Sequence, residues 1–259
     1  MSLAPHAEPF QHAGDPTSAR GRTGFLLSHG FTGSPVSMRP WADHLTAAGY
    51  AVSLPLLPGH GTTWQQMNDT TWDDWRTALE TELTALAARV DTVVIAGLSM
   101  GGGLALRLAA DHPDLVSGLV LVNPAVNSTR FDVRLLPLLK HVVRSVPGIA
   151  DDIKKPGAQE YGYTRTPVRA AASMFAGYRD LRRDLSRVVC PVLLFHSAED
   201  HVVDPSSSRI IVESVSSSDV RLETLHESYH VATLDHDAPT IFESSTAFAD
   251  RVAAARAEG

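Results

Sequence analysis

Short apolar segments recur along the chain and are separated by stretches with helical periodicity. The apolar segments lie at 24–30, 50–56, 91–97, 117–123, 190–197 and 220–225. Most of them are nearly continuous in apolar residues, which is typical of parallel strands that helices cover on both faces. The stretches 70–90 and 101–113 have the periodicity of helices. The pattern predicts a doubly wound α/β sheet.

One interval, from about residue 127 to residue 185, breaks this alternation. It holds two amphipathic helical patterns with no strand between them. The apolar positions are Leu135, Leu138, Leu139, Val142, Val143 and Val146 in the first pattern, and Val168, Ala171, Phe175, Tyr178, Leu181 and Leu185 in the second. Such a pair is typical of an insertion across the ligand-bearing edge of the sheet. The alternative is two ordinary crossover helices packed on the sheet.

Composition and charge exclude several classes of protein. The 259 residues suffice for one domain with a full core, and 44% of them are hydrophobic. The formal net charge is −7 and no dense run of Lys or Arg occurs, so we expect no nucleic acid partner. The single cysteine, Cys190, falls in the apolar stretch VVCPVLLF, which predicts a buried and inert thiol.

The beginning of the sequence is rich in Pro, Gly, Ser and His, which predicts a flexible N-terminal leader over residues 1–20. It has neither a basic region nor an apolar region of the kind that signal peptides carry. No segment reaches the roughly 18 apolar residues that a membrane span needs. We therefore expect no transmembrane segment and a cytoplasmic location. The sequence does not indicate the oligomeric state.

A serine lies between two glycines in the stretch AGLSMGG, residues 96–102. A G-x-S-x-G pattern between a strand and a helix is a nucleophile elbow, in which only glycine fits beside the strained serine. The turn predicts an exposed hydroxyl at Ser99, and the N–H of Met100 points at charge that develops on a bound carbonyl. A Gly-rich turn without function is the alternative.

A second glycine-containing turn, SHGFTGSP at 28–35, follows the first strand of the predicted sheet. Glycines there would let a backbone N–H approach a substrate, as an oxyanion loop requires. The N–H of Phe31 is the candidate, and a plain Gly turn is the alternative.

An acid follows the apolar segment 190–197, in the stretch HSAEDHVVDP. The carboxyl ends of parallel strands are where open α/β sheets hold their ligands. Asp200 is the preferred acid. Asp204 precedes Pro205 and a helical pattern, so it is expected to cap a helix, and Glu199 is expected to be a solvated neighbour.

A histidine follows the last predicted strand, in the stretch HESYHVATLDHD. His230 is the preferred base, because the turn that carries it comes soon after the strand and continues into the final helix. His226 and His236 are expected to be polar surface residues. The order Ser99, Asp200, His230 is the order that α/β-hydrolases use for nucleophile, acid and base.

Taken together, the motifs HGFTGSP, LPGHGTT, GLSMGG, AEDHVV and SYHVATLDHD resemble those of the bacterial monoacylglycerol lipase and thermophilic carboxylesterase group of α/β-hydrolases. The resemblance extends from about Phe10 to the C-terminus. It implies a mostly parallel sheet flanked by helices, a core formed by residues 21–126 and 186–259, and a cap formed by residues 127–185.

The resemblance also implies an activity, namely cleavage of a monoacylglycerol to fatty acid and glycerol through an acyl-enzyme intermediate. Ser99, Asp200 and His230 would form the triad, and the N–H groups of Phe31 and Met100 would form the oxyanion hole. In monoacylglycerol lipases of this group an apolar residue and a glutamate of the cap lie at the alcohol end of the site, and the positions here that match are Ile149 and Glu160.

Two further histidines, His29 and His60, also match the family pattern, and we interpret both as structural. We expect no cofactor and no metal, because no His, Asp or Glu cluster has ligand spacing. The expected partner is a small lipid ester, and the cap could contact lipid surfaces transiently. The alternatives are a general carboxylesterase for short to medium acyl esters and a non-catalytic binding protein on the same fold.

Overall fold

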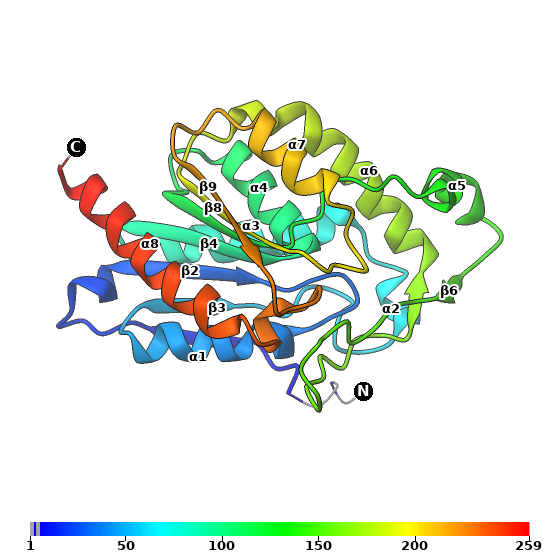
Figure 1. The fold of residues 1–259 in the computed structure, drawn as a ribbon, viewed down its shortest axis with the longest axis horizontal. Coiled ribbons are helices and arrows are strands. Elements are labelled where there is room, and N and C mark those ends of the chain that lie inside the picture. The colour runs from blue at the N-terminus through cyan, green and yellow to red at the C-terminus, as the bar shows by residue number, and fades with distance from the viewer. Residues whose placement is uncertain (1–2, 4–5, 259) are drawn as a thin grey trace.

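A seven-stranded sheet forms the centre of the computed structural model, which describes residue 3 and residues 6–258 (Figure 1). Its strands have the spatial order β1-β3-β2-β4-β5-β8-β9. They are β1 (Phe10–Ala13), β2 (Thr23–Ser28), β3 (Ala51–Leu54), β4 (Thr92–Leu98), β5 (Gly118–Val122), β8 (Val192–Ser197) and β9 (Val220–Leu225). The pair β1–β3 is antiparallel, and the other neighbours in this sheet are parallel. The predicted parallel sheet is therefore confirmed.

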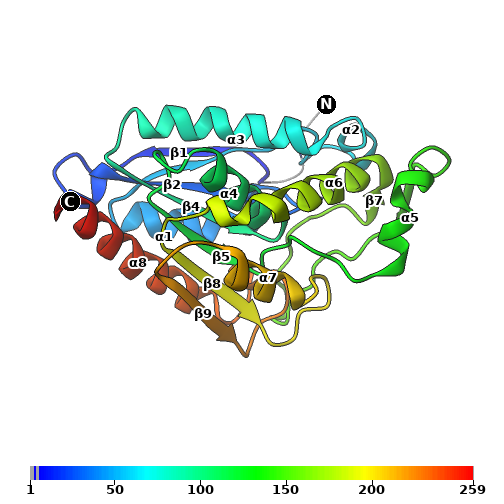
Figure 2. The ribbon, with the colours of Figure 1, turned by 90° about the horizontal axis from the view of Figure 1, so that it is seen from above.

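Helices cover both faces of this sheet (Figure 2). One face carries α3 (Trp72–Ala87), α4 (Met100–Asp111), α6 (Val168–Asp184) and α7 (Ser206–Ser214), and the other carries α1 (Arg39–Ala47) and α8 (Ala238–Glu258). Among the described residues, the other helices are α2 (Trp64–Met67) and α5 (Phe131–Leu139), with short 3-10 turns η1 (Ala19–Arg22), η2 (Pro35–Met38), η3 (Leu185–Arg187) and η4 (Ala232–Leu234).

The central strand β4 explains why the strand segments are continuously apolar. All of its residues are buried. Val93 and Ile95 belong to the core under α3, α4 and α6, whereas Val94 and Ala96 belong to the core under α1 and α8. Successive side chains of a strand point to opposite faces, so a strand covered on both sides needs an apolar residue at every position.

The N-terminal segment differs from the expected flexible leader. Phe10–Ala13 forms the edge strand β1, in which Phe10 pairs with Leu54. Arg39 stacks on the ring of Phe10, with the guanidinium carbon 4.2 Å from the ring centre. The expectation for residues 1–20 is wrong over this strand, because an edge strand is held by backbone pairing and needs no continuous apolar run.

The second helical pattern of the predicted insertion, α6, packs on α3 and α4. A Cβ at Gly177 would lie 2.4 Å from the Trp72 ring, and Arg107 of α4 forms an ion pair with Asp184 at 2.7 Å. Helix α6 is therefore a crossover helix, which was the alternative interpretation. We use the term cap below for residues 127–167.

The first helical pattern ends earlier than expected. Helix α5 ends at Leu139, and Val146 lies in β6 (Ser145–Pro147), which pairs antiparallel with β7 (Arg165–Pro167). The expectation of a helical face through Val146, with no strand before the second helix, is wrong. A residue that precedes proline is biased toward extended backbone, and Val146 precedes Pro147.

Candidate active site

Ser99 lies between β4 and α4 with the backbone angles φ +57° and ψ −119°. A positive φ is strained for a residue other than glycine. A Cβ at Gly97 would lie 2.4 Å from the carbonyl oxygen of Gly101, and a Cβ at Gly101 would lie 2.1 Å from the carbonyl oxygen of Ser28. The turn therefore excludes any larger residue at both glycine positions, as the G-x-S-x-G pattern predicts.

The elbow is fixed by backbone hydrogen bonds. The N–H of Ser99 donates to the carbonyl of Val122 at 3.0 Å. The carbonyl of Ser99 accepts from the N–H of Gly102 and from the N–H of Ala125, each at 3.0 Å. Met100 is the first residue of α4, where N–H groups have no partner within the helix.

The loop after β2 passes directly beside the serine. A Cβ at Gly30 would lie 3.3 Å from Cβ of Ser99. Thr32 has a φ of +64°, and the N–H of Gly33 donates to the carbonyl of Gly30 at 3.3 Å, so the chain turns tightly around Phe31. The backbone of this loop is thus close to the serine, where an oxyanion loop must be.

Two buried histidines support that loop. Nδ1 of His29 donates to the carbonyl of Gly30 at 3.0 Å, and its Nε2 accepts from the N–H of Leu57 at 3.2 Å. Burial lowers the pKa of His29 to about 4 and that of His60 well below its ordinary value. Burial thus disfavours the charged form of both rings, and the contacts of His29 agree with a structural role.

His230 and Asp200 form a hydrogen-bonded pair. Nδ1 of His230 lies 2.9 Å from Oδ2 of Asp200, and the two side chains are only 8% and 2% exposed. Oδ1 of Asp200 accepts from the N–H groups of Val202 and Val203, each at 2.8 Å. Both oxygens of the carboxylate are thus engaged, which fixes its orientation.

The charges of this pair stabilise each other. Burial by itself raises the pKa of Asp200, but His230 and the backbone N–H donors outweigh it, so the pKa lies below its ordinary value. Burial lowers the pKa of His230, but Asp200, followed by Glu160 and Asp152, outweighs it, so that pKa is raised. Asp200 would therefore stabilise the imidazolium that forms when His230 takes up a proton.

The other acids considered from the sequence lie elsewhere. Glu199 is exposed. Oδ1 of Asp204 accepts from the N–H of Ser206, the first residue of α7, at 2.8 Å. Asp204 thus bonds the first N–H of α7, but the N-cap position is Pro205, so Asp204 lies one residue before the cap that its sequence context predicts.

The segment 226–237, which carries His230, is called the base loop below and contains two other histidines. His226 and His236 are exposed, in contrast to the buried ring of His230.

Asn123 is a residue that the sequence analysis missed. It follows β5, has a φ of +44° and is 1% exposed. Its Nδ2 donates to the carbonyl of His230 at 2.8 Å and to Oγ of Ser197 at 2.9 Å. Two residues later, Ala125 bonds the carbonyl of Ser99. Asn123 therefore links the base loop to the elbow, and its signal in the sequence was a polar residue closing an apolar strand.

Two acids that join the cap to the base loop were also missed. Oδ2 of Asp152 accepts from the N–H of His230 at 3.2 Å, and Oδ1 lies 2.8 Å from Nδ1 of His201. Asp235 accepts from the backbone N–H groups of Lys154 and Tyr229 at 2.6 and 3.0 Å. The loop of the cap is therefore attached to the segment that carries His230.

The two cap positions implied by the resemblance lie in different surroundings. Oε2 of Glu160 is 3.5 Å from where a Cβ at Gly33 would be, so the carboxylate faces the loop beside Ser99. Glu160 is partly buried, and burial raises its pKa, which His230 opposes. Ile149 is 53% exposed on the cap.

The described part of the chain has neither a group of metal-binding side chains nor a helix that could span a membrane. Among residues 3 and 6–258, no three His, Cys, Asp or Glu side chains are grouped so that they could hold a metal ion. Within the same residues, no helix has the length and apolar character needed to cross a membrane.

Known proteins match this chain over most of its length. A family model described as "Serine aminopeptidase, S33" matches residues 20–237. A thermostable monoacylglycerol lipase of Bacillus sp. strain H-257 is 41% identical over 247 residues, which cover 93% of this chain and 94% of that protein.

Solved structures agree with this match. One structure, of LipS and LipT, two metagenome-derived lipolytic enzymes, superposes with a TM-score of 0.91 and 38% identity over 96% of this chain and 100% of that chain. A soluble variant of monoglyceride lipase from Saccharomyces cerevisiae, in complex with a substrate analogue, shares the fold with a TM-score of 0.76 and 19% identity, over 97% of each chain.

Proposed function

Because the chain belongs to the serine aminopeptidase S33 family of hydrolases, within the α/β-hydrolase superfamily, we propose that it is an ester hydrolase that cleaves monoacylglycerols to fatty acid and glycerol. The observation that carries the proposal is the strained Ser99 beside Gly30, in a fold that also pairs a buried His230 with Asp200. A binding protein without catalysis has no use for a strained serine.

In the first half of the reaction, Oγ of Ser99 attacks the acyl carbon while His230 takes its proton. Since Nδ1 of His230 is bonded to Asp200, Nε2 is the nitrogen left for this transfer. The tetrahedral intermediate then collapses, the ester C–O bond breaks, and His230 returns the proton to the departing glycerol oxygen. Asp200 holds the tautomer and stabilises the imidazolium.

In the second half, water replaces glycerol. His230 takes a proton from water as the water oxygen attacks the acyl-enzyme, and it then returns the proton to Oγ of Ser99 as the fatty acid leaves. The N–H groups of Phe31 and Met100 would hold the oxyanion in both halves. Loss of one such donor costs about 2.7–4 kcal/mol in comparable sites.

Glu160 supports the preference for a monoacylglycerol. Its carboxylate faces Gly33, in the loop that carries Phe31, and it is close enough to His230 for each charge to shift the pKa of the other. A carboxylate there can accept hydrogen bonds from the free hydroxyls of a glycerol leaving group. Such bonds to a charged acceptor contribute about 1.5–3 kcal/mol, enough to discriminate between esters of one acid.

The test is a panel of substrates assayed with the purified protein. It contains mono-, di- and triacylglycerols of graded acyl length, nitrophenyl esters of the same acids, and an aminoacyl nitroanilide. The proposal expects the highest kcat/KM on a monoacylglycerol. Equal or higher kcat/KM on nitrophenyl and simple alkyl esters would favour the general carboxylesterase, and turnover of the nitroanilide alone would favour a peptidase.

A further inference from the structure

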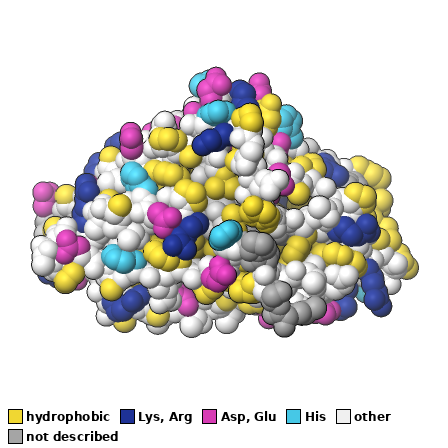
Figure 3. Space-filling view, turned by 90° about the horizontal axis from the view of Figure 1, so that it is seen from below, with side chains coloured by type: hydrophobic (Ala, Val, Ile, Leu, Met, Phe, Trp, Pro, Cys, Tyr) yellow, Lys and Arg dark blue, Asp and Glu magenta, His cyan; other side chains and the backbone are white. Residues whose placement is uncertain are grey.

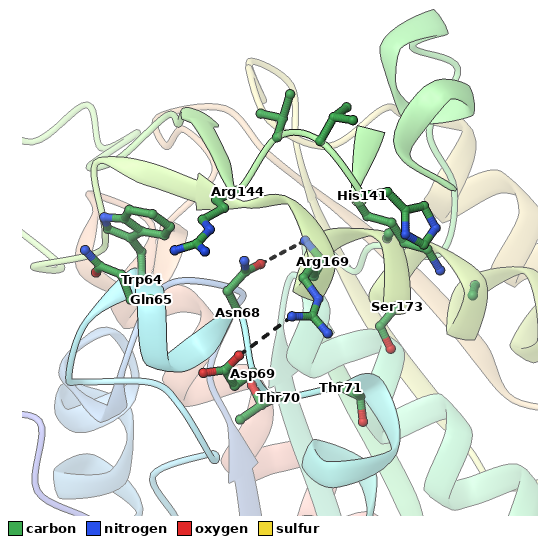
Figure 4. Close-up of a pocket in the computed structure, with 15 residues that line it drawn as sticks. Trp64, Gln65, Asn68, Asp69, Thr70, Thr71, His141, Arg144, Arg169 and Ser173 are labelled. Atoms are coloured by element: carbon green, nitrogen blue, oxygen red, sulfur yellow. Dashed lines mark hydrogen bonds and ion pairs between the residues drawn. The ribbon is translucent and has the colours of Figure 1, made fainter. Parts of the chain in front are cut away.

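A pocket of about 970 Å³ lies where α2, the turn after α5 and the first turns of α6 meet (Figure 4). It is lined by Trp64, Gln65, Asn68, Asp69, Thr70, Thr71, residues 140–144, Arg169, Ala172, Ser173 and Ala176. Ser99, Asp200 and His230 are not among these residues. The pocket is therefore separate from the candidate active site.

The charge of this pocket is opposite to that of the whole chain. Lys140, His141, Arg144 and Arg169 contribute to its lining, against the single carboxylate of Asp69. Asp69 lies 4.0 Å from Nη1 of Arg169. Within the described part of the chain, Arg144 has no ion-pair partner. A cluster of cations in a protein of net charge −7 is a local feature, not a consequence of general basicity.

Polar residues of α2 and of the segment after it border the two arginines. In Figure 4, Arg144 reaches toward Trp64 and Asn68, and Arg169 lies between Asp69 and Ser173. Oδ1 of Asn68 accepts from the backbone N–H of Arg169 at 2.8 Å, which fixes the start of α6 against α2 and leaves the guanidinium free to face the pocket. Guanidinium groups in such positions suit the planar, multidentate recognition of phosphate oxygens.

An exposed apolar face adjoins the pocket. It consists of Phe131, Leu135 and Leu138 of α5 and of Val142 in the turn that follows, and is called the apolar face of α5 below; these side chains are 71%, 38%, 73% and 79% exposed. None of the described side chains of α5 is buried. Figure 3 shows hydrophobic side chains and Lys or Arg side chains gathered at the end of the molecule that α5 occupies in Figure 1. Apolar and basic side chains side by side are typical of helices that lie on lipid surfaces.

We propose that this pocket binds the phosphate of an anionic glycerophospholipid while the apolar face of α5 enters the surrounding lipid. The two features together select this occupant, because a free phosphate compound would engage the arginines and leave the apolar face uncovered. A neutral lipid surface would cover the apolar face and leave Arg144 without a partner. The inference does not depend on ester hydrolysis, because binding is measured without turnover.

The experiment is flotation of the purified full chain with vesicles of phosphatidylcholine alone or mixed with phosphatidylglycerol. The wild type is expected to bind the mixed vesicles more tightly, and added salt should weaken this binding. Each of Arg144→Gln and Arg169→Gln should lower partitioning about fivefold, and both together about 25-fold, since one cation near an anionic surface contributes about that factor. Leu138→Ser with Val142→Ser should lower binding to both vesicles.

The matched control is Arg89→Gln, which removes an exposed arginine near the end of α3 and should bind like the wild type. Hydrolysis of a soluble nitrophenyl ester should be unchanged in all these variants, which verifies that they are folded.

Three results would overturn the proposal. One is binding by the wild type that is no tighter to vesicles with phosphatidylglycerol, or binding that Arg144→Gln and Arg169→Gln together do not weaken. Another is calorimetric binding of inorganic phosphate or glycerol phosphate, lost in Arg144→Gln, without any vesicle binding, which would assign the pocket to a free phosphate compound. The third is a stable dimer that Leu138→Ser dissociates, which would assign the apolar face to a second copy.

Discussion

The carboxylate of Asp152, in the cap, accepts a hydrogen bond from the backbone N–H of His230 at 3.2 Å. The carbonyl of Asp152 also accepts from the N–H of Val231 at 3.1 Å. These bonds connect the cap directly to the loop of the proposed base. The position of the imidazole therefore depends on a residue far from it in the sequence.

Replacement of this acid tests whether it positions the base. Asp152→Asn is expected to lower kcat/KM between about fivefold and 150-fold, the range for a weakened buried hydrogen bond. The charges that raise the pKa of His230 are Asp200, Glu160 and Asp152, in that order. Removing the charge of Asp152 lowers that pKa, so His230 stays neutral to lower pH. The acid limb of the pH profile of kcat/KM should move to lower pH.

The matched control is Glu199→Gln, which removes an exposed carboxylate next to Asp200 and should leave the limb in place, because water screens exposed charges. A uniform loss of activity at every pH in Asp152→Asn would mean that this residue only supports the cap.

Substitution of the elbow serine separates catalysis from stability. Ser99→Ala should retain the fold and lower ester hydrolysis by on the order of 10⁴-fold or more. Ser99→Gly should be inactive too, yet more stable by about 1 kcal/mol, because glycine relieves the strain of a φ of +57°. Thermal unfolding measures the difference in stability. After the wild-type protein is treated with a serine-directed phosphonate, mass spectrometry should find the adduct at Ser99. An adduct on another serine would refute the assignment.

The two aspartates after β8 should respond differently to the same change. Asp200→Asn should lower kcat by on the order of 10⁴-fold, because the amide favours the wrong imidazole tautomer. Asp204→Asn should change kcat and stability little, since Asn caps helices about as well as Asp. Steady-state kinetics on one soluble ester makes the comparison. Similar losses of kcat in both variants would contradict the assignment of Asp200.

The raised pKa of Glu160 predicts a pH-dependent stability. Burial is the main cause, so folding opposes ionisation of this carboxyl. The resulting loss of folding stability is absent below the ordinary pKa of glutamate, where the carboxyl is protonated in both the folded and the unfolded state. It is complete above the raised pKa of the folded state. Glu160→Gln should therefore raise the melting temperature at neutral pH and leave it unchanged in acid. A lower melting temperature at neutral pH would show that the charge stabilises the cap.

The same residue should also control the choice of leaving group. Glu160→Gln should lower kcat/KM on a monoacylglycerol by up to about tenfold, because an amide is a weaker acceptor than a carboxylate. A nitrophenyl ester of the same acid has no free hydroxyls on its leaving group, so its kcat/KM should not change. Parallel losses on both esters would indicate that Glu160 holds the cap in place.

The sequence by itself determined the elements whose signals are local. The continuous apolar run of β4 predicted a strand covered on both faces, and the structure has it there because each successive side chain enters one of the two cores. The glycines at 97 and 101 predicted the elbow, since close backbone contact excludes a Cβ at either position. Asp200 and His230 were predicted from their places after strands at one edge of the sheet, and in the structure their side chains are hydrogen-bonded.

Tertiary structure alone decided the features that depend on distant partners. Edge strand β1 exists because Phe10–Ala13 pairs with β3. Helix α6 is a crossover helix because it packs against Trp72 and forms an ion pair with Arg107. The bond between Asp152 and His230 joins residues 78 positions apart. Periodicity and turn chemistry report only neighbours within a few positions, so the sequence shows that a carboxylate is present but not which backbone N–H it will meet after folding.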